Sequence, residues 1–299
     1  MAEASSSVLI MGGSGFIGTA LASYLTSQGC SVSILSRSPE KIKEYSSFFW
    51  NPELGQVDYN AFLNQDYIIN LCGTSIGAKY WTRKRKQEII DSRIKPLQIL
   101  DSSLKKIKQV PKKVLTASAI GIYGSAPGVQ LDENSPEGKG FLANVCKQWE
   151  QEADVLTCPV VKMRIGVVLS DEGGFVEQMT KILRTRLNVI WGNGRQKVSW
   201  IHLYDLVRAI YFLMNSETQP VYNLTSPCET SSRALNRLIA RSNNFRPLSF
   251  KLPKHLVKAL LGSFSELFFN DQNAKPEQLT KQGFSFRYNK PSEVFVQRV

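Results

Sequence analysis

The 299-residue sequence predicts an α/β protein with a doubly wound parallel sheet and a smaller, interleaved C-terminal α/β lobe. The first observation is a series of short, continuously apolar runs in the first 170 residues, which is typical of strands covered on both faces. The second is that segments with helical spacing separate these runs. Right-handed crossovers then place helices on both faces of the sheet.

The elements of the first part follow in a regular order. Strands are expected at 7–13, 31–38, 66–73 and 158–170, and 112–124 is expected to be a strand that enters a loop; helices are expected at 15–29, within 79–113 and at 139–156. In the first helix, Ile17, Leu21 and Leu25 share one face, and Gly29 is a suitable end. The alternation predicts a dinucleotide-binding domain over residues 1–170, to which later segments return.

After residue 170 the alternation of predicted strands and helices is less regular. Residues 192–214 predict a Gly-rich loop, a short strand and a helix, and 222–226 predict a short strand. A helix with a Thr or Ser cap is expected at 230–243. The tail at 252–288 predicts small helices and a closing strand. We therefore expect residues 171–299 to form a smaller lobe for a substrate or partner.

A glycine-rich segment, "GGSGFIG", follows the first predicted strand. It comprises Gly12, Gly13, Ser14, Gly15, Phe16, Ile17 and Gly18. Two glycine registers fit, 13-15-18 and 12-15-18. A strand, a tight turn and a helix direct backbone N–H groups at a phosphate, and Gly18 would allow close packing of helix and strand. This arrangement predicts a Rossmann-type dinucleotide site.

The end of the second strand distinguishes NAD from NADP. An acidic residue there would bind a ribose 2′-hydroxyl, whereas Arg suits a 2′-phosphate. The sequence has Ser36 and Arg37, and the next carboxylate is Glu40. We therefore expect NADP (NADPH), with a plain surface role for Arg37 as the alternative.

The net charge of +12 is concentrated in one segment. Residues 79–113 contain twelve Lys/Arg and three Asp/Glu, a net charge of +9. Apolar residues at helical spacing in the same segment predict an amphipathic helix with a solvated basic face. Binding of an anion, cofactor phosphates included, is the other interpretation. No nucleic-acid module is recognisable.

Composition excludes several classes of protein. No apolar run approaches the length that spans a bilayer. Five cysteines without CxxC spacing predict reduced thiols and a cytoplasmic location. With only two histidines, we expect no metal site of the usual zinc type.

Several strings resemble one family. "MGGSGFIG", "NLCG", "SAIGIYG" and "WIHLYDLVRAI" are similar to the extended short-chain dehydrogenase/reductases. "LSR", "KQWE", "RIGVVL" and "GFSFRY" are more specific. They resemble the atypical NAD(P)-dependent epimerase/dehydratase subgroup described as epimerase-family or SulA-like, putative cell-division inhibitor proteins, with an appended small C-terminal domain. The resemblance covers nearly the whole chain.

The resemblance implies an NADP-binding site. Its contacts would be the glycine segment, Ser36 and Arg37 on the 2′-phosphate, and a further set from later segments: Leu71, Cys72, Glu88, Arg93 and Val168. Arg93 would face the cofactor while Arg83, Lys84, Arg85 and Lys86 face water.

The catalytic pattern of the family is incomplete. Ser118 is present, and Tyr123 lies on the following loop, so both are candidate catalytic residues. The helix that should contain Tyr-x-x-x-Lys has Leu142 and Cys146, or Ala143 and Lys147 in the other register. Without that pair the usual general acid is absent.

Other candidate groups have weaker support. Lys147 is expected to be solvated, and Cys146 has no nearby base in the sequence. His202 is expected to be a buried histidine bonded to Asp205 or the backbone, although a place near the substrate is the alternative.

Two functions stay open. The first is an NADP-dependent oxidoreductase or epimerase acting on an unknown small polar substrate. The second is a catalytically silent NADP sensor that acts through a protein partner, of the cell-division type. A nucleic-acid or membrane-surface role for residues 79–113 rests on charge alone.

Overall fold

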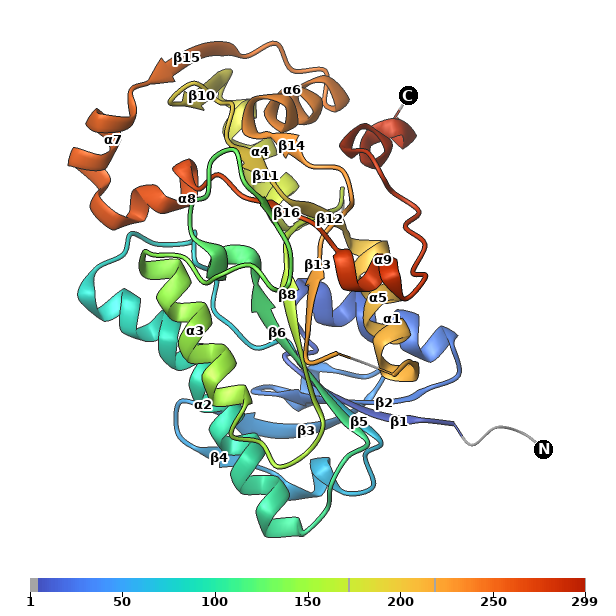
Figure 1. The fold of residues 1–299 in the computed structure, drawn as a ribbon. Helices are drawn as coiled ribbons and strands as arrows, with labels where there is room; N and C mark the ends of the chain where they lie inside the picture. Colours follow the sequence, from blue (N-terminus) through green and yellow to red (C-terminus); the bar gives the residue numbers. More distant parts are fainter. Residues whose placement is uncertain (1–4, 172, 218, 299) are drawn as a thin grey trace. The chain divides into compact units, whose positions relative to one another are not determined.

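An eight-stranded sheet is the main feature of the structure, a computed structural model that describes residues 5–171, 173–217 and 219–298. Its strands are β1 (Ser7–Met11), β2 (Ser31–Ser36), β3 (Ser46–Asn51), β4 (Gln56–Val57), β5 (Tyr67–Asn70), β6 (Lys113–Ala119), β8 (Val160–Ile165) and β13 (Val221–Leu224). The strand order is β13-β8-β6-β5-β1-β2-β3-β4 (Figure 1). The central pairs are parallel, and only the short β4 runs antiparallel to its neighbour β3 among the pairings described here.

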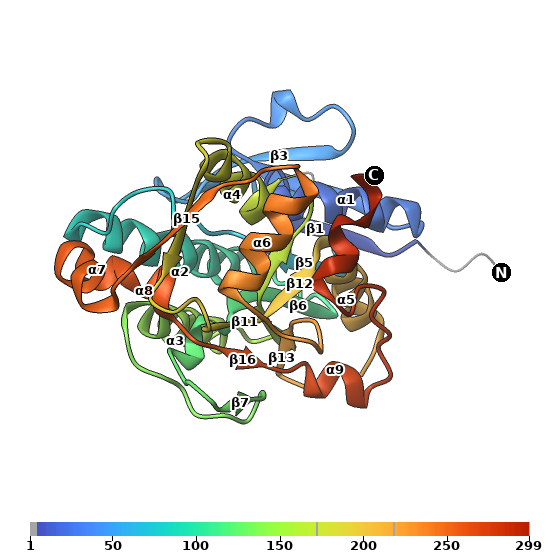
Figure 2. The ribbon, with the colours of Figure 1, turned by 90° about the horizontal axis from the view of Figure 1, so that it is seen from above.

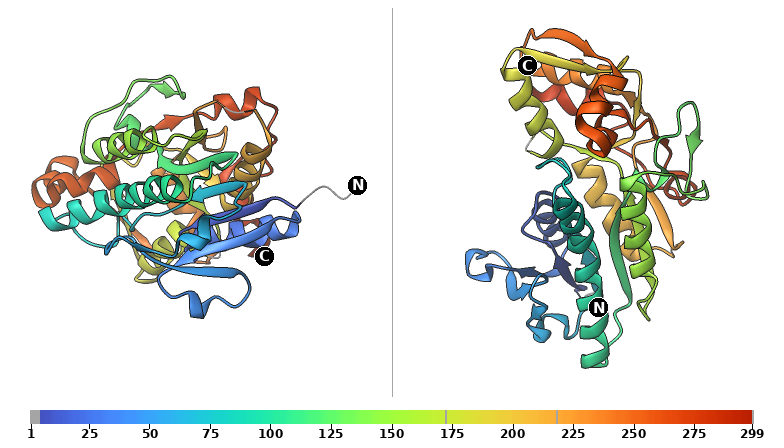
Figure 3. Two further views of the ribbon diagram at one scale, coloured as in Figure 1. Left: turned by 90° about the horizontal axis from the view of Figure 1, so that it is seen from below. Right: turned by 90° about the vertical axis from the view of Figure 1, so that its left-hand side faces the viewer.

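Helices cover both faces of this sheet (Figures 1 and 3). On one face lie α1 (Phe16–Ser27) and α5 (Leu203–Asn215), where the rings of Tyr24 and Tyr211 meet edge to face at 5.9 Å. On the other lie α2 (Arg83–Ile107) and α3 (Phe141–Ala153). The predicted α/β class with a doubly wound sheet is confirmed.

The strands are apolar because both faces of the sheet are covered. In β1, Val8 through Met11 are completely buried, and every residue of β5 is buried. On α1, Leu21 and Leu25 are fully buried, as the helical spacing predicted. Burial of such apolar side chains is the main contribution to the stability of the sheet and its helices.

Helix α2 begins and continues for identifiable reasons. The Thr82 side chain caps it by accepting a hydrogen bond from the Arg85 N–H at 3.1 Å. Ile89, Leu97 and Leu100 are buried at helical spacing. The helix continues past Pro96 and ends at Lys108, which has left-handed backbone angles.

A lysine holds the end of α5. Lys113 Nζ, at the start of β6, donates to the carbonyl oxygens of Leu213 (2.7 Å), Met214 (3.2 Å) and Ser216 (2.8 Å). The last carbonyls of a helix have no partners within the helix, and an ammonium group there also suits the helix dipole.

The chain divides into two compact units. The first combines the stretch up to Ser118 with Val145–Met163 and Val207–Val221, and the second takes Ala119–Asn144, Arg164–Leu206 and the stretch from Tyr222 onward. The chain therefore leaves the first unit and returns to it twice.

The second unit contains short strand pairs and helices. Its strands pair as β7 (Gln130–Leu131) with β16 (Asn273–Ala274), β9 (Val167–Leu169) with β12 (Trp200–His202), β10 (Leu187–Trp191) with β15 (Leu248–Leu252), and β11 (Lys197–Val198) with β14 (Thr230–Ser231). Its helices are α4 (Gly174–Arg184), α6 (Ser232–Ser242), α7 (Lys254–Leu261), α8 (Glu266–Phe269) and α9 (Glu277–Lys281) (Figure 2). The predicted additional C-terminal α/β region is confirmed.

Trp200 is at the centre of the core of the second unit. Its side chain is completely buried with Leu183, Leu235 and Ile239, and its indole N–H donates to the Cys228 carbonyl at 2.7 Å. The indole polar group is thereby satisfied within an apolar cluster.

Two predicted strands differ from the structure. The strand expected at 158–170 is divided at Gly166, where an added Cβ would lie 2.9 Å from the Ser199 carbonyl oxygen. The closing strand expected in the tail at 252–288 is wrong for the end of that tail, because no strand follows α9 in the described residues. There the N–H groups of Arg287 and Tyr288 donate to the buried Asp205 carboxylate, which takes the place of a neighbouring strand.

Candidate functional site

The glycine loop joins the carboxyl end of β1 to α1. Gly12 has a φ of +82°, and a Cβ there would also lie 3.2 Å from the Leu71 carbonyl. At Gly18 a Cβ would lie 2.5 Å from the Gly12 carbonyl oxygen, so helix and loop approach as closely as the sequence predicted. Gly15 precedes the helix and has no side chain to cap it, which leaves first-turn N–H groups available to an anion.

A cleft of about 680 Å³ opens beside this loop in the first unit. It lies at the carboxyl ends of β1, β2 and β5, where open parallel sheets bind ligands. Eight of the predicted cofactor residues line it: Gly12, Ser14, Gly15, Ser36, Arg37, Leu71, Cys72 and Glu88. Of the remaining loop residues, Gly13 packs on Ile34, while Phe16, Ile17 and Gly18 begin the helix.

Cys72 lies at the floor of this region and is a structural group. Its N–H donates to the side chain of the fully buried Asn70 at 3.1 Å, and Asn70 in turn donates to Thr116 at 3.0 Å. Burial raises the pKa of the Cys72 thiol, so the sulfur remains protonated at neutral pH.

Arg37 is an unengaged cation in the cleft. Its side chain is exposed, and within residues 5–171, 173–217 and 219–298 it has neither an ion-pair nor a hydrogen-bond partner. The adjacent Ser36 is buried, and its hydroxyl oxygen accepts the Ser38 N–H at 3.1 Å. A free guanidinium beside a fixed hydroxyl suits a phosphate monoester.

Two arginines of α2 hold the loop that follows β5. Arg85 donates to the Ser75 carbonyl at 2.6 Å, to the Thr74 hydroxyl at 3.1 Å and to the Glu88 carboxylate at 3.0 Å. The expectation that Arg85 faces water is wrong, because only 9% of the residue is exposed. The acceptors that hold this side chain inside are a loop carbonyl and a loop hydroxyl, and no sequence pattern indicates them.

Arg93 supports the same loop from about two helical turns further along α2. It donates to the Ile89 carbonyl at 2.9 Å and to the Thr74 carbonyl at 3.3 Å, and it lies over the Trp149 ring. Burial lowers the pKa of Arg93 to about 10, so the guanidinium stays charged at neutral pH. Arg93 contacts Gly73, which lines the cleft, and does not line the cleft itself.

Ser118 lies at the carboxyl end of β6 and is almost completely buried. Its hydroxyl donates to Glu150 Oε1 of α3 at 2.6 Å. On the same helix Cys146 is buried and Lys147 is half-buried, so Lys147 is less exposed than expected. The structure thus pairs the predicted Ser with a carboxylate rather than with a Tyr.

Tyr123 belongs to a buried network in the second unit. Its hydroxyl donates to Asn223 at 2.7 Å and accepts from Arg164 at 3.0 Å. Burial raises the pKa of Tyr123 to about 12 despite the opposing effect of Arg164. Both hydrogen-bonding capacities of the phenol are engaged, so a catalytic role would require rearrangement of this network.

Comparison with known proteins identifies the family. The model of the NAD dependent epimerase/dehydratase family matches residues 8–225, and a domain of unknown function, DUF1731, matches residues 252–294. The chain belongs to the NAD-dependent epimerase/dehydratase family. The resemblance stated from the sequence is confirmed.

Relatives in this family match nearly the whole chain. An epimerase family protein of Mycobacterium leprae is 36% identical over 97% of this chain and 95% of its own length. The epimerase family protein YfhF of Bacillus subtilis is 32% identical over 94% of each. The solved structure of the human epimerase family protein SDR39U1 with NADPH has a TM-score of 0.82 and 25% identity, and covers 98% of each chain. This chain is therefore an epimerase-family protein with an NAD(P)-binding, short-chain-dehydrogenase-like fold.

Two further predicted residues lie in the second unit of this epimerase-family chain. Val168 is the middle residue of β9 and pairs with Ile201 of β12. His202 accepts the Tyr204 N–H at 3.0 Å and stacks on Tyr288 at 3.7 Å, so it is bonded to the backbone as expected, but it is half-buried rather than buried. Burial lowers the pKa of His202, so the ring is neutral at pH 7.

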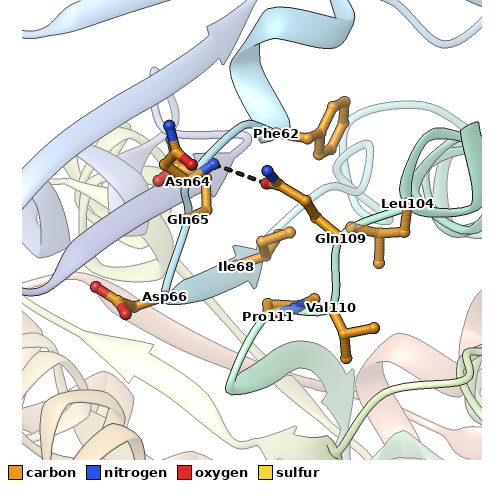
Figure 4. A pocket seen from close by; sticks show the side chains of 9 residues that line it. All are labelled: Phe62, Asn64, Gln65, Asp66, Ile68, Leu104, Gln109, Val110 and Pro111. Atoms are coloured by element: carbon orange, nitrogen blue, oxygen red, sulfur yellow. Dashed lines mark hydrogen bonds between the residues drawn. The ribbon is translucent and has the colours of Figure 1, made fainter. Parts of the chain in front are cut away.

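A smaller cavity of about 350 Å³ lies elsewhere in the first unit (Figure 4). Asp66 and Pro111 line it just before β5 and β6, and the Asn64 N–H donates to Gln109 at 2.8 Å. The cavity is therefore at the amino ends of the strands, opposite to the end at which this epimerase family binds its nucleotide.

The described residues form neither a metal-binding cluster nor a membrane-spanning helix. No group of three His, Cys, Asp or Glu side chains there is arranged to hold a metal ion. No helix in the described part of the chain is long and apolar enough to cross a membrane.

Proposed function

We propose that this protein binds NADP(H) in the 680 Å³ cleft and uses it for oxidoreduction, or for epimerisation through a transient keto form, of a small-molecule substrate. The observation that carries the proposal is Arg37, a free cation beside Ser36 in the cleft of the glycine loop. The human relative that was solved with NADPH supports the same cofactor.

Different residues of the chain would bind different parts of the cofactor. The glycine loop and α1 would receive the pyrophosphate, Ser36 and Arg37 the 2′-phosphate, and the loop held by Arg85 and Arg93 would close the adenosine side. A bound nicotinamide supplies or accepts the hydride. Leu71, Glu88 and Val168 remain proposed cofactor contacts.

Ser118 is the proposed substrate-orienting group. Because its hydroxyl donates to Glu150, the lone pairs of its oxygen can accept a hydrogen bond from a substrate hydroxyl. Glu150 would accept the proton that the Ser118 hydroxyl passes on. The second unit would supply the substrate-binding lobe, and the cytoplasm is the proposed location.

The test is a comparison of NADPH and NADH affinities in the wild type and in Arg37→Gln. We expect the preference for NADPH to fall by roughly 10- to 100-fold, the range of one charge-assisted contact. The matched control is Arg83→Gln, which removes an exposed arginine of α2 that does not line the cleft. Equal affinities of the wild type for the two cofactors would contradict the 2′-phosphate assignment.

The network around Tyr123 favours a second candidate, a silent NADP sensor that acts through a protein partner. The engaged hydroxyl and the absent Tyr-x-x-x-Lys pair leave no ordinary general acid. Screening with NADPH against carbonyl compounds and nucleotide sugars separates the two. Turnover that Tyr123→Phe abolishes would defeat the sensor, whereas tight NADPH binding without turnover would favour it.

A further inference from the structure

The two-stranded sheet β10–β15 in the second unit has two unlike faces. Side chains alternate between the faces along each strand. On one face the Asn188 side chain donates to the Ser249 hydroxyl at 3.1 Å and accepts from Asn236 of α6 at 3.2 Å. Asn188 and Ile190 are buried there, so this face packs on α6.

The opposite face is entirely apolar. We call it the apolar strip, and its residues are Leu187, Val189, Trp191, Leu248, Phe250 and Leu252. Leu248 is 76% exposed, Leu187 45% and Phe250 40%, and no strip residue belongs to the core around Trp200. At the other end the Trp191 ring stacks on Phe268 at 4.1 Å. The strip therefore runs from an open end to an aromatic end.

The chain around the strip is uniformly basic. Residues 230–265 contain seven Lys/Arg and no Asp/Glu, and residues 178–200 contain five Lys/Arg and no Asp/Glu. Arg186 directly precedes Leu187, and its carbonyl accepts the Leu248 N–H at 2.9 Å. Arg186 and Arg246 are exposed and have no ion-pair partner in the described part of the chain. Two exposed arginines thus precede the two strands at the open end of the strip.

The length of the apolar strip suits a ligand with an extended hydrocarbon chain. Four residue steps along a strand span roughly 13 Å. An extended alkyl chain of about ten carbons is of similar length. Half-exposed leucine and phenylalanine side chains would gain free energy by contact with such a chain, at about 25 cal/mol per Å² of apolar surface removed from water.

We propose that the apolar strip binds an anionic amphiphile: an aliphatic or aromatic body of about ten carbons that carries one carboxylate or phosphate. The body lies along the strip toward Trp191 and Phe268, and the anionic group lies at Arg186 and Arg246. A nucleotide sugar would leave the strip uncovered, and a second copy of this +12 chain would bring like charges together.

The experiment measures binding of sodium decanoate by isothermal titration below its micelle concentration, with decyltrimethylammonium as the probe of equal length and opposite charge. We expect decanoate to bind at least 10-fold more tightly. The double variant Arg186→Gln/Arg246→Gln should abolish this difference. Equal affinity of the wild type for the two probes, or no binding of either, would overturn the proposal.

Variants of the strip localise the site. Leu187→Gln, Leu248→Gln and Phe250→Gln should each weaken decanoate binding by 3-fold or more. The control is Leu54→Gln, which changes a leucine that is 67% exposed in the first unit and should have no effect. Melting temperature and NADPH affinity are measured for every variant, so a misfolded variant is recognised and excluded.

Two further measurements distinguish other possible ligands of the apolar strip. Cosedimentation with phosphatidylglycerol vesicles but no binding of decanoate would assign the strip to a membrane surface and overturn the proposal. Dimer formation that Leu248→Gln abolishes would overturn it in favour of a second copy. Decanoate binding is scored without cofactor, so failure of NADPH binding would defeat only the proposed function.

Discussion

The Ser118 hydroxyl donates to the Glu150 carboxylate across the β6–α3 contact, at 2.6 Å, with both side chains more than nine-tenths buried. The contact lies at the carboxyl end of β6, on the helix where related dehydrogenases have their Tyr and Lys. The pair is therefore both a structural contact and the proposed proton-handling group.

Ser118→Ala separates these two roles. Loss of a buried hydrogen bond to a charged group should lower the free energy of unfolding by about 1.5–3 kcal/mol, measured by urea denaturation. If Ser118 orients substrate, turnover should fall by 10-fold or more at unchanged NADPH affinity. Ser118→Thr, which keeps the hydroxyl, is the control, and unchanged turnover in the Ala variant would exclude the orienting role.

Gly18→Ala should damage the cofactor cleft. Its Cβ would lie 2.5 Å from the Gly12 carbonyl oxygen and 2.6 Å from the Gly13 Cα, and both neighbours are backbone. We expect the variant to lose about 2–4 kcal/mol of stability and most of its NADPH affinity. Gly77→Ala has no neighbour within 4 Å and should change stability by less than about 0.5 kcal/mol. A Gly18 variant as stable as this control would show that helix and loop can move apart.

Arg85→Met tests the anchoring of the loop after β5. The Ser75 carbonyl and the Thr74 hydroxyl would lose their donor, which should cost about 2–3 kcal/mol and speed amide hydrogen exchange across residues 73–77. NADPH affinity should fall because Gly73 and Thr74 line the cleft. Arg83→Met, at an exposed position of the same helix, should leave exchange and affinity unchanged.

Acid should weaken the second unit through Glu229. Hydrogen bonds from Lys275 and Lys197 lower the pKa of Glu229 to about 2. A carboxylate with a lowered folded-state pKa adds stability above its unfolded pKa near 4.3, and this stability disappears as the pH falls toward 2. With allowance for solvent screening the contribution is about 2 kcal/mol.

The check for Glu229 is thermal unfolding between pH 2 and pH 7. Glu229→Gln should be less stable than the wild type at pH 7 and should show less loss of stability between pH 5 and pH 2. Parallel curves for the two proteins would contradict the assignment of this acid dependence to Glu229.

The first unit was predictable because local rules govern it. The apolar runs of β1 and β5, the glycine loop and the spacing of α1 each require only nearby residues to be interpreted. The eight cleft residues follow from that local pattern together with the family resemblance.

Contacts between distant residues were not predictable. Arg85 belongs to a basic segment that predicts exposure to solvent, yet its side chain is buried because it donates to the Ser75 carbonyl ten positions earlier. The Asp205 carboxylate accepts backbone N–H groups 82 and 83 positions later, at the end of the tail where a closing strand was expected. The apolar strip depends on the pairing of residues 187–191 with 248–252, and no local pattern encodes that pairing.

The place of β13 at the edge of the eight-stranded sheet has a consequence for synthesis on the ribosome. Since β13 is formed by Val221–Leu224, and the Lys113 contacts at the end of α5 need Leu213 to Ser216, a nascent chain of 170 residues lacks α5 on one face of the sheet and has an unpaired β8 edge. The eight-stranded sheet can be completed only after about three quarters of the chain has been translated. Until then the apolar surface that α5 covers and the open β8 edge would favour aggregation of the nascent polypeptide.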